Sequence, residues 1–246
     1  LSLRKAMSFG FSFGLTLISV TWVMAFLDLK HGSRTMLLGA FSVTSVVETT
    51  LVTLQTWRGV PSHFNVETPL DAMVASTLAA GGIALVVLIV LFTALAFRAN
   101  AGVPLSMRVA IRVGFVTLLA ALVVGGLMIA KGMSLVFGGH PQAAYASGGF
   151  LKPTHAVAMH GILLLPALAW LLSFSDLTER RRLNTVFVGE AGYLAVALAV
   201  AWGNVAGRSP TSITVLTVAL PGALLLAASL FTVARHLGHA SRQGLL

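Results

Sequence analysis

The chain contains no cysteine and very few charged residues for its length. The lack of cysteine excludes disulfides, zinc sites built from thiolates and iron–sulfur clusters held by cysteine. Only 9% of the 246 residues are charged, whereas 57% are hydrophobic. A soluble domain usually has about 25% charged residues, which keep its surface hydrated. The composition is therefore not that of a water-soluble globular protein.

The apolar residues form long blocks without the alternation that is typical of barrel strands. About 20 apolar residues are enough to cross the hydrocarbon core as a helix, which satisfies its own backbone groups there. The sequence therefore predicts an all-α, polytopic transmembrane helix bundle of about seven helices, in a single transmembrane domain that covers residues 1–246. The expected spans are residues 7–27, 35–57, 70–97, 107–131, 153–174, 185–202 and 210–233.

Basic residues outnumber acidic ones, 16 to 7. In a soluble protein this excess would suggest nucleic acid as a partner. Here the basic residues flank the apolar blocks, so we expect contact with the lipid bilayer and no nucleic acid. The loops on the side of the C-terminus carry more Lys and Arg than those on the side of the N-terminus. The positive-inside rule then predicts that the N-terminus lies outside and the C-terminus in the cytoplasm, for a protein that we expect in the cell inner (plasma) membrane.

Two ionisable residues lie well inside predicted spans, at a similar depth. Glu48 precedes Trp57 by nine residues, or about 13 Å of helix, and His160 follows Pro153 by seven residues. Ionisable groups inside a bilayer are costly and usually face the bundle interior or a cavity. We therefore expect Glu48 to contact His160. This contact fits a metal-bound histidine oriented by a carboxylate, a proton or ion pathway, or a buried hydrogen-bonded pair without a ligand.

Histidines are the best candidates for holding a cofactor. His63, His155 and His160 fall toward the predicted outer face, and imidazole is a common axial ligand of haem iron. His155 and His160 are five positions apart, roughly 140° around a helix, so on a regular helix they would serve two partners rather than clamp one ion. We predict that these three histidines, with Glu48 as a further metal ligand, bind haem b or a divalent or transition metal.

The loop that contains His63 is rich in polar residues. Together with Asn65, Glu67 or Asp71, His63 would offer nitrogen and oxygen ligands to a divalent cation. The alternative is a capped interfacial turn, in which Thr68 or Asp71 caps the next helix.

A second pair of charges is expected near the other membrane face. Arg112 lies in the first turns of the fourth block, and Glu190 lies about six residues into the sixth. An ion pair between Arg112 and Glu190 would lower the cost of burying both charges.

Two motifs resemble a pattern in uncharacterised bacterial polytopic membrane proteins. They are RGxxSHFN, from Arg58 to Asn65, and HxxxxHG, from His155 to Gly161. The resemblance covers the predicted second to fifth helices and implies a membrane fold without an assigned activity.

Three functions are compatible with these residues. A redox subunit that holds haem or a metal near the outer face is the leading hypothesis. A proton- or ion-coupled transporter or channel, with Glu48 and His160 as its binding groups, is the second. A non-catalytic accessory subunit of a membrane complex is the third, and its partners would be other membrane subunits or further copies of the chain. Whether the protein is an enzyme stays open.

Overall fold

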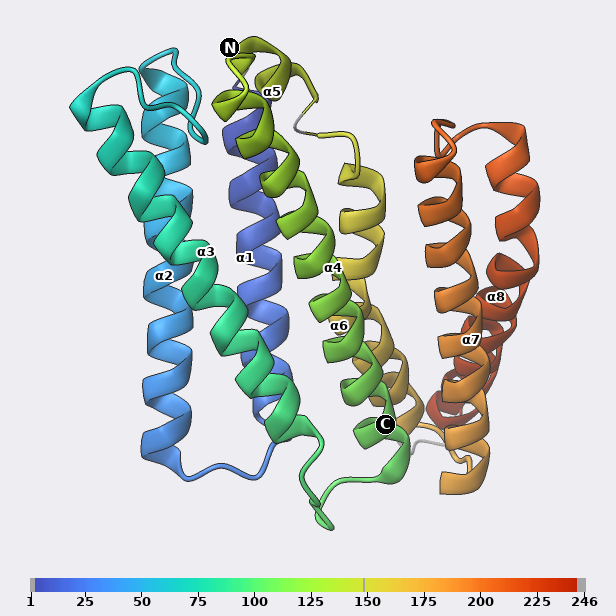
Figure 1. Ribbon diagram of the computed structural model, residues 1–246. Coiled ribbons are helices and arrows are strands. Elements are labelled where there is room, and N and C mark those ends of the chain that lie inside the picture. Colours follow the sequence, from blue (N-terminus) through green and yellow to red (C-terminus); the bar gives the residue numbers. More distant parts are fainter. Residues whose placement is uncertain (1–2, 148, 243–246) are drawn as a thin grey trace. The chain divides into compact units, whose positions relative to one another are not determined.

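The computed structural model describes residues 3–147 and 149–242, and within these residues it has eight helices and no strand (Figure 1). Seven helices are long and apolar enough to cross a membrane, and the short α5 is the exception. The predicted all-α, multi-pass architecture is thus confirmed. The helices are α1 (Arg4–Met24), α2 (His31–Trp57), α3 (Pro69–Ala96), α4 (Leu105–Phe137), α5 (Pro141–Ser147), α6 (Lys152–Ser173), α7 (Glu179–Val205) and α8 (Ile213–Arg242).

The fourth helix is longer than the sequence predicted. We expected it to end at Lys131, but α4 continues to Phe137, and α5 occupies part of the region predicted as a loop. The helix ends where Gly139 adopts a left-handed conformation, with φ of 80°. There the backbone N–H of His140 donates to the carbonyl of Leu135, which is the pattern of a Schellman motif. Glycine adopts this conformation without steric cost, so the stop lies at Gly139 and not at Gly132.

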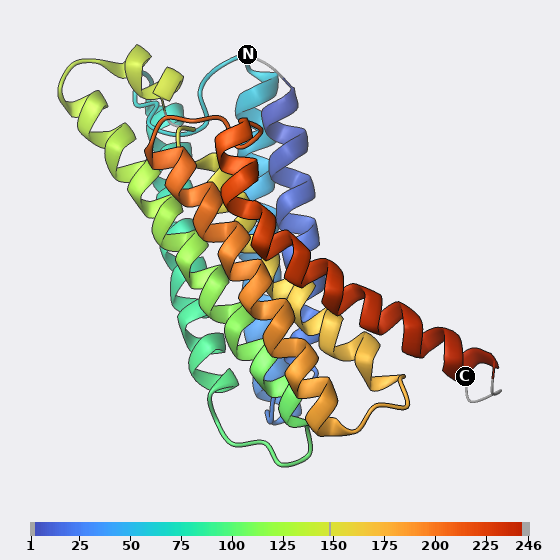
Figure 2. The same cartoon turned by 90° about the vertical axis from the view of Figure 1, so that its right-hand side faces the viewer.

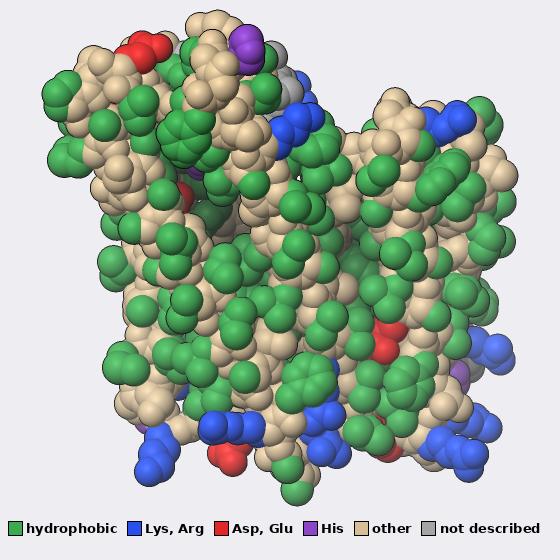
Figure 3. Space-filling model, in the orientation of Figure 1, with side chains coloured by type: hydrophobic (Ala, Val, Ile, Leu, Met, Phe, Trp, Pro, Cys, Tyr) green, Lys and Arg blue, Asp and Glu red, His purple; other side chains and the backbone are tan. Residues whose placement is uncertain are grey.

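The chain divides into two compact units. The first comprises Leu1–Leu95 and Gly125–Phe150, and the second comprises Ala96–Val124 and Leu151–Leu246. α4 contributes to both. In each unit, hydrophobic side chains cover the middle of the helices, and most Lys and Arg lie near the helix ends (Figure 3). This distribution suits helices surrounded by lipid tails and flanked by headgroups. The single transmembrane domain stays a prediction.

In the first unit, α2 and α3 run antiparallel with a fixed register. At the end where the α2–α3 loop joins them, Gln55 of α2 hydrogen-bonds to Asp71 of α3. One to two turns further in, Val52 forms a buried cluster with Val74 and Leu78. This cluster, called here the apolar layer, has Phe9 of α1 and Leu51 packed against it.

In the second unit, α7 and α8 approach closely at two glycines. A Cβ added at Gly192 would lie 2.6 Å from the carbonyl oxygen of Gly222, and one added at Gly222 would lie 2.7 Å from that of Gly192. The two backbones are therefore in direct contact, as is common where small residues face each other in membrane helices. Beyond this contact α8 diverges from α7 (Figure 2).

This contact predicts the effect of adding one methyl group. Gly192→Ala should lower the stability of the detergent-solubilised protein by about 1–3 kcal/mol, because the methyl group meets backbone atoms that cannot rotate away. Thermal unfolding would measure the change. Gly126→Ala is the matched control, since no atom lies within 4 Å of its added Cβ. Equal melting temperatures for the two variants would contradict the proposed contact.

Candidate functional site

Glu48 lies in the interior of the first unit, on the inward face of α2. Its residue is 4% exposed. Within the described part of the chain, its Oε1 is buried and has no hydrogen-bond partner. A buried ionised carboxylate without a partner is very costly, and such a group usually takes up a proton and becomes neutral. The group is thus suited to binding a proton or another cation.

The carboxyl group of Glu48 packs directly against Gly81 of α3. A Cβ added at Gly81 would overlap Oε1 of Glu48, whereas one added at the neighbouring Gly82 would meet no atom within 4 Å. Gly81 therefore leaves the space in which this oxygen sits. This role is not predictable from the sequence, because Gly81 and Gly82 look alike within an apolar helix.

A polar network closes the α2–α3 end of the same unit. Arg58 donates to Oδ1 of Asp71 at 2.7 Å, and the amide of Gln55 donates to the same oxygen at 2.9 Å. The Thr68 hydroxyl donates to Oδ2 of Asp71 at 2.6 Å, and the Asp71 N–H donates to the Thr68 oxygen at 3.2 Å. The predicted capping of α3 by Thr68 or Asp71 is thus confirmed. Both carboxylate oxygens of Asp71 are engaged in this network.

The apolar layer lies between this network and Glu48. Along α2 the order is Gln55, Val52, Glu48, and along α3 it is Asp71, Val74, Leu78 and then Gly81. Because Gln55 bonds to Asp71 and Glu48 touches Gly81, the two helices match level by level. The polar network comes first, the apolar layer second, and the Glu48 carboxyl group against Gly81 third. Apolar side chains therefore separate the buried carboxyl group from the polar end of the unit.

His63 belongs to the α2–α3 loop and lies at this same end. Its Nδ1 shares a 2.9 Å hydrogen bond with the Ser62 hydroxyl, which accepts one of 2.5 Å from Nζ of Lys5. Its ring lies edge-on to Phe9, with 6.3 Å between centroids. Burial, together with the nearby ammonium of Lys5, lowers the pKa of His63 to about 4. The imidazole is therefore neutral near pH 7.

Sequence reasoning missed the contact between Lys5 and Ser62. These residues are 57 positions apart, and nothing in the local pattern of either one indicates a partner. Knowledge that the start of α1 lies beside the α2–α3 loop is needed to find it.

His155 and His160 both lie on α6, in the second unit. Nδ1 of His155 donates to the carbonyl of Ala121 on α4 at 2.7 Å, and Nδ1 of His160 donates to the carbonyl of Ala156 at 2.5 Å. Because a carbonyl only accepts, each Nδ1 carries a proton, which leaves Nε2 as the acceptor or ligand atom of a neutral ring. The contact between Glu48 and His160 stays a prediction.

The described residues contain no group of three or more His, Asp or Glu side chains that could hold a metal ion. The predicted metal site at His63, His155, His160 and Glu48 therefore has no support from a preformed ligand cluster. The binding of haem by the three histidines stays a prediction.

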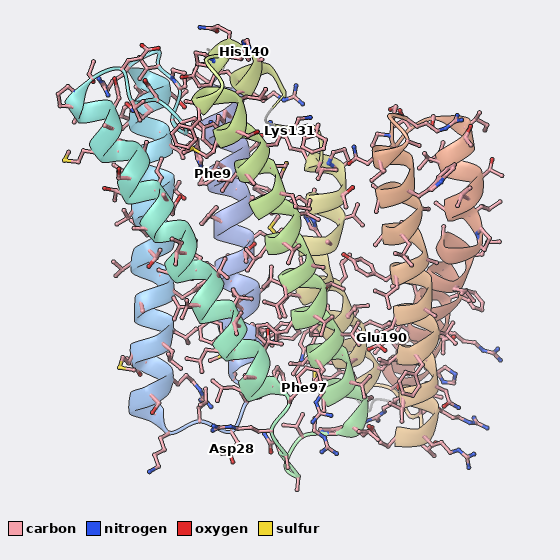
Figure 4. All side chains as sticks on the ribbon, viewed as in Figure 1. Phe9, Asp28, Phe97, Lys131, His140 and Glu190 are labelled. Carbon is pink, nitrogen blue, oxygen red and sulfur yellow. The ribbon has the colours of Figure 1, made fainter. Side chains whose placement is uncertain are left out.

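Glu190 and Arg112 belong to the second unit. Glu190 is 5% exposed, and its buried Oε1 has no hydrogen-bond partner in the part of the chain that the structure describes (Figure 4). Arg112 donates from Nε to the carbonyl of Ala96 at 3.1 Å, and its guanidinium lies over the ring of Phe97. Arg112 thus stabilises the carbonyl end of α3. An ion pair between Arg112 and Glu190 stays a prediction.

The polar network predicts that loss of the Gln55 amide destabilises the protein. Gln55→Leu should cost about 1–3 kcal/mol, because buried polar partners would lose a hydrogen bond without gaining water. Thr56→Val is the control, since the Thr56 hydroxyl donates only to the carbonyl of Val52 in its own helix. Thermal unfolding in detergent would compare them, and a smaller loss for Gln55→Leu than for Thr56→Val would refute the role of the network.

Comparison with known proteins adds no relative from which a role could be transferred. No family model, no curated protein and no solved structure matches this chain. The seven long apolar helices make the chain a multi-pass integral membrane protein.

Proposed function

We propose that this membrane protein binds and releases protons at Glu48, as part of a proton-coupled transporter or channel. The observation that carries the proposal is the buried Oε1 of Glu48, which has no hydrogen-bond partner among the described residues. Carboxyl groups inside a membrane protein are costly to keep and often mark proton or ion pathways.

A proton suits this carboxyl group better than a metal ion does. Calcium and magnesium need about six or more oxygen ligands, including waters, at short and regular distances. Glu48 instead packs against a glycine, and no group of three His, Asp or Glu side chains in the described residues could surround an ion. A single proton neutralises the carboxyl group and removes most of the cost of its burial.

The second unit offers a counterpart in Glu190, which is also buried with an oxygen that lacks a partner among the described residues. We assign Glu190 as a second proton-binding group. The distribution of Lys and Arg supports an inner-membrane orientation with the N-terminus, and with it the α2–α3 loop, on the outside.

Haem or metal binding is the second candidate function. The observation that favours it is the hydrogen bond from Nδ1 of His155 to Ala121, with a similar bond from His160, because metal-bound histidines usually donate their second N–H to an acceptor. The absorption spectrum and metal content of the purified protein would decide. The absence of both a Soret band and bound metal would rule this candidate out.

Neutralising Glu48 tests the main proposal. Glu48→Gln keeps the size of the side chain but cannot take up a proton, so proton flux into reconstituted vesicles should fall at least about tenfold. A pH-sensitive dye inside the vesicles would report the flux. The infrared C=O band of a protonated carboxyl group should also weaken in the purified variant. Glu67→Gln, at an exposed acid of the α2–α3 loop, is the control and should change neither signal. Unchanged flux together with an unchanged band in Glu48→Gln would refute the proposal.

The two adjacent glycines of α3 give a second test. Gly81→Ala should displace the carboxyl group of Glu48 and lower proton flux several-fold, because its new methyl group would overlap Oε1. Gly82→Ala adds the same methyl group where no atom lies within 4 Å, so its flux should match that of the parent protein. If both variants behave alike, contact with Gly81 does not matter for the site.

A further inference from the structure

The middle of the loop between α2 and α3 folds into the end of the first unit, whereas the two ends of the loop are exposed. Ser62 is 2% exposed and Asn65 is fully buried, although both belong to a polar connecting segment. Loops usually run over the surface, where water satisfies their backbone groups. Residues 61–65, called here the plug segment, contain both of these buried side chains, and the other three are partly exposed.

The plug segment is held from two helices. On one side, Nζ of Lys5 in α1 donates to the Ser62 hydroxyl at 2.5 Å, and Phe9 of α1 lies beside the ring of His63. On the other side, the ring of Phe64 occupies the space that Gly132 leaves on α4, where an added Cβ would lie 2.5 Å from Cε2 of Phe64. The segment thus spans from α1 to α4 across this end of the unit.

The plug segment also carries two unfavourable features. Phe64 has a φ of 65°, a left-handed conformation that is an outlier for a bulky side chain. Nδ2 of Asn65 is buried and has no hydrogen-bond partner in the described residues. Such costs persist only where the surroundings hold them, and they are common at switch regions. Both features raise the free energy of this conformation, so its contacts with α1 and α4 must hold it in place.

Beneath the plug segment lies the apolar layer, and beyond that lies Glu48. Phe9 connects the first two, because it contacts both His63 and the cluster of Val52, Val74 and Leu78. On the face shown in Figure 3, a hollow opens beside α3 in this unit, and an acidic and a histidine side chain are visible at its wall. The plug segment and the apolar layer therefore both lie between the α2–α3 end and the buried carboxyl group.

We propose that the plug segment is a proton-sensitive gate, which opens the path from the α2–α3 end to Glu48 when His63 becomes protonated. The inference rests on the proposed function in one respect, that Glu48 is the group to which the path leads. The geometry of the segment and its response to acid do not depend on what Glu48 does.

The charges around His63 set the direction of the response. From α1 the ammonium of Lys5 faces this imidazole, whereas its ring contacts, Phe9 of α1 and Phe64 of the loop, are uncharged. Protonation would thus place a second positive charge beside Lys5 in a partly desolvated site. In the closed conformation the pKa of His63 is lowered to about 4, whereas a histidine released into water has a pKa of about 6.5. The closed form is therefore favoured above pH 6.5, and it loses about tenfold in population relative to the open form for each pH unit between about 6.5 and about 4.

Thiol labelling can measure this opening, because the chain has no cysteine of its own. Val52→Cys places one thiol in the apolar layer, where Val52 is fully buried. Ser209→Cys, in an exposed turn, corrects for the intrinsic effect of pH on thiol reactivity. The probe is a small, positively charged methanethiosulfonate, applied to the full-length protein in detergent. We expect the rate ratio of Val52→Cys to Ser209→Cys to rise about tenfold per pH unit from pH 6.5 to 4.5.

Histidine variants identify the sensor. Adding His63→Phe, which fills the same space without titrating, should abolish the rise in the ratio. His140→Phe removes an exposed histidine of the same unit and should leave the rise intact. A Val74→Cys reporter repeats the measurement if Val52→Cys does not fold. A ratio that does not change with pH, or one that rises equally in His63→Phe, would overturn the gate.

The same labelling separates the gate from the function of Glu48. In a Glu48→Gln background the rise with acid should persist, because His63 and its contacts are unchanged. If proton flux fails to depend on Glu48 while labelling still depends on His63, the gate stands and the assigned destination is wrong. If flux depends on Glu48 while the labelling ratio does not change with pH, the proposed function stands and the gate is wrong.

Discussion

The cost of burying a carboxyl group in an apolar span is the constraint on which the first unit depends. Glu48 is buried within α2, so the helix that faces it must provide room for an oxygen rather than another apolar side chain. α3 provides this room with Gly81, the position where an added methyl group would overlap that oxygen. The inward face of α2 then follows from helical spacing, because Phe41, Ser45, Val52 and Gln55 are also buried and lie one or two turns apart. A single costly group thus fixes which face of α2 points inward and which residue of α3 meets it.

The register of α2 and α3 determines the order of the residues between the polar network and Glu48. Gln55 and Asp71 tie the helices at one end, and Arg58 and Thr68 complete the bonds of the Asp71 carboxylate. With that end fixed, Val52 must meet Val74 and Leu78, and Glu48 must lie beyond them. Both oxygens of the Asp71 carboxylate are satisfied by these hydrogen bonds. The buried carboxyl group lacks such bonds among the described residues, so a transferable proton is better assigned to Glu48 than to Asp71.

Hydropathy predicted the spans well because the bilayer sets their length, and counting residues from the helix ends placed Glu48 and His160 well inside them. The end of α4 was missed because Gly132 was interpreted as the start of a loop, although helices tolerate glycine where a neighbour needs the space, here the ring of Phe64. Gly81 and the contact between Lys5 and Ser62 were not predictable, since both roles arise from tertiary packing between distant segments. For the histidines, the residue type predicted more than the structure shows. Their residue type suggested ligands, but the described residues hold no cluster of three ligating groups, and each imidazole has a hydrogen bond of its own.

The energetics of the plug segment explain how a single proton can move it. A strained φ costs of order 1–3 kcal/mol, as at Phe64, and a buried donor without a partner costs about the same, as at Asn65. Against these costs stand the hydrogen bond from the exposed Lys5 to Ser62, of about 0.5–1.5 kcal/mol, and the contacts of the His63 ring with Phe9 and with Phe64, of about 0.5–1.5 kcal/mol each. The unfavourable and favourable free energies are of similar size, so the closed conformation of the segment is only narrowly favoured. A charge on His63 would reduce this small free-energy difference directly. We therefore assign the switch to this histidine and not to the larger network around Asp71.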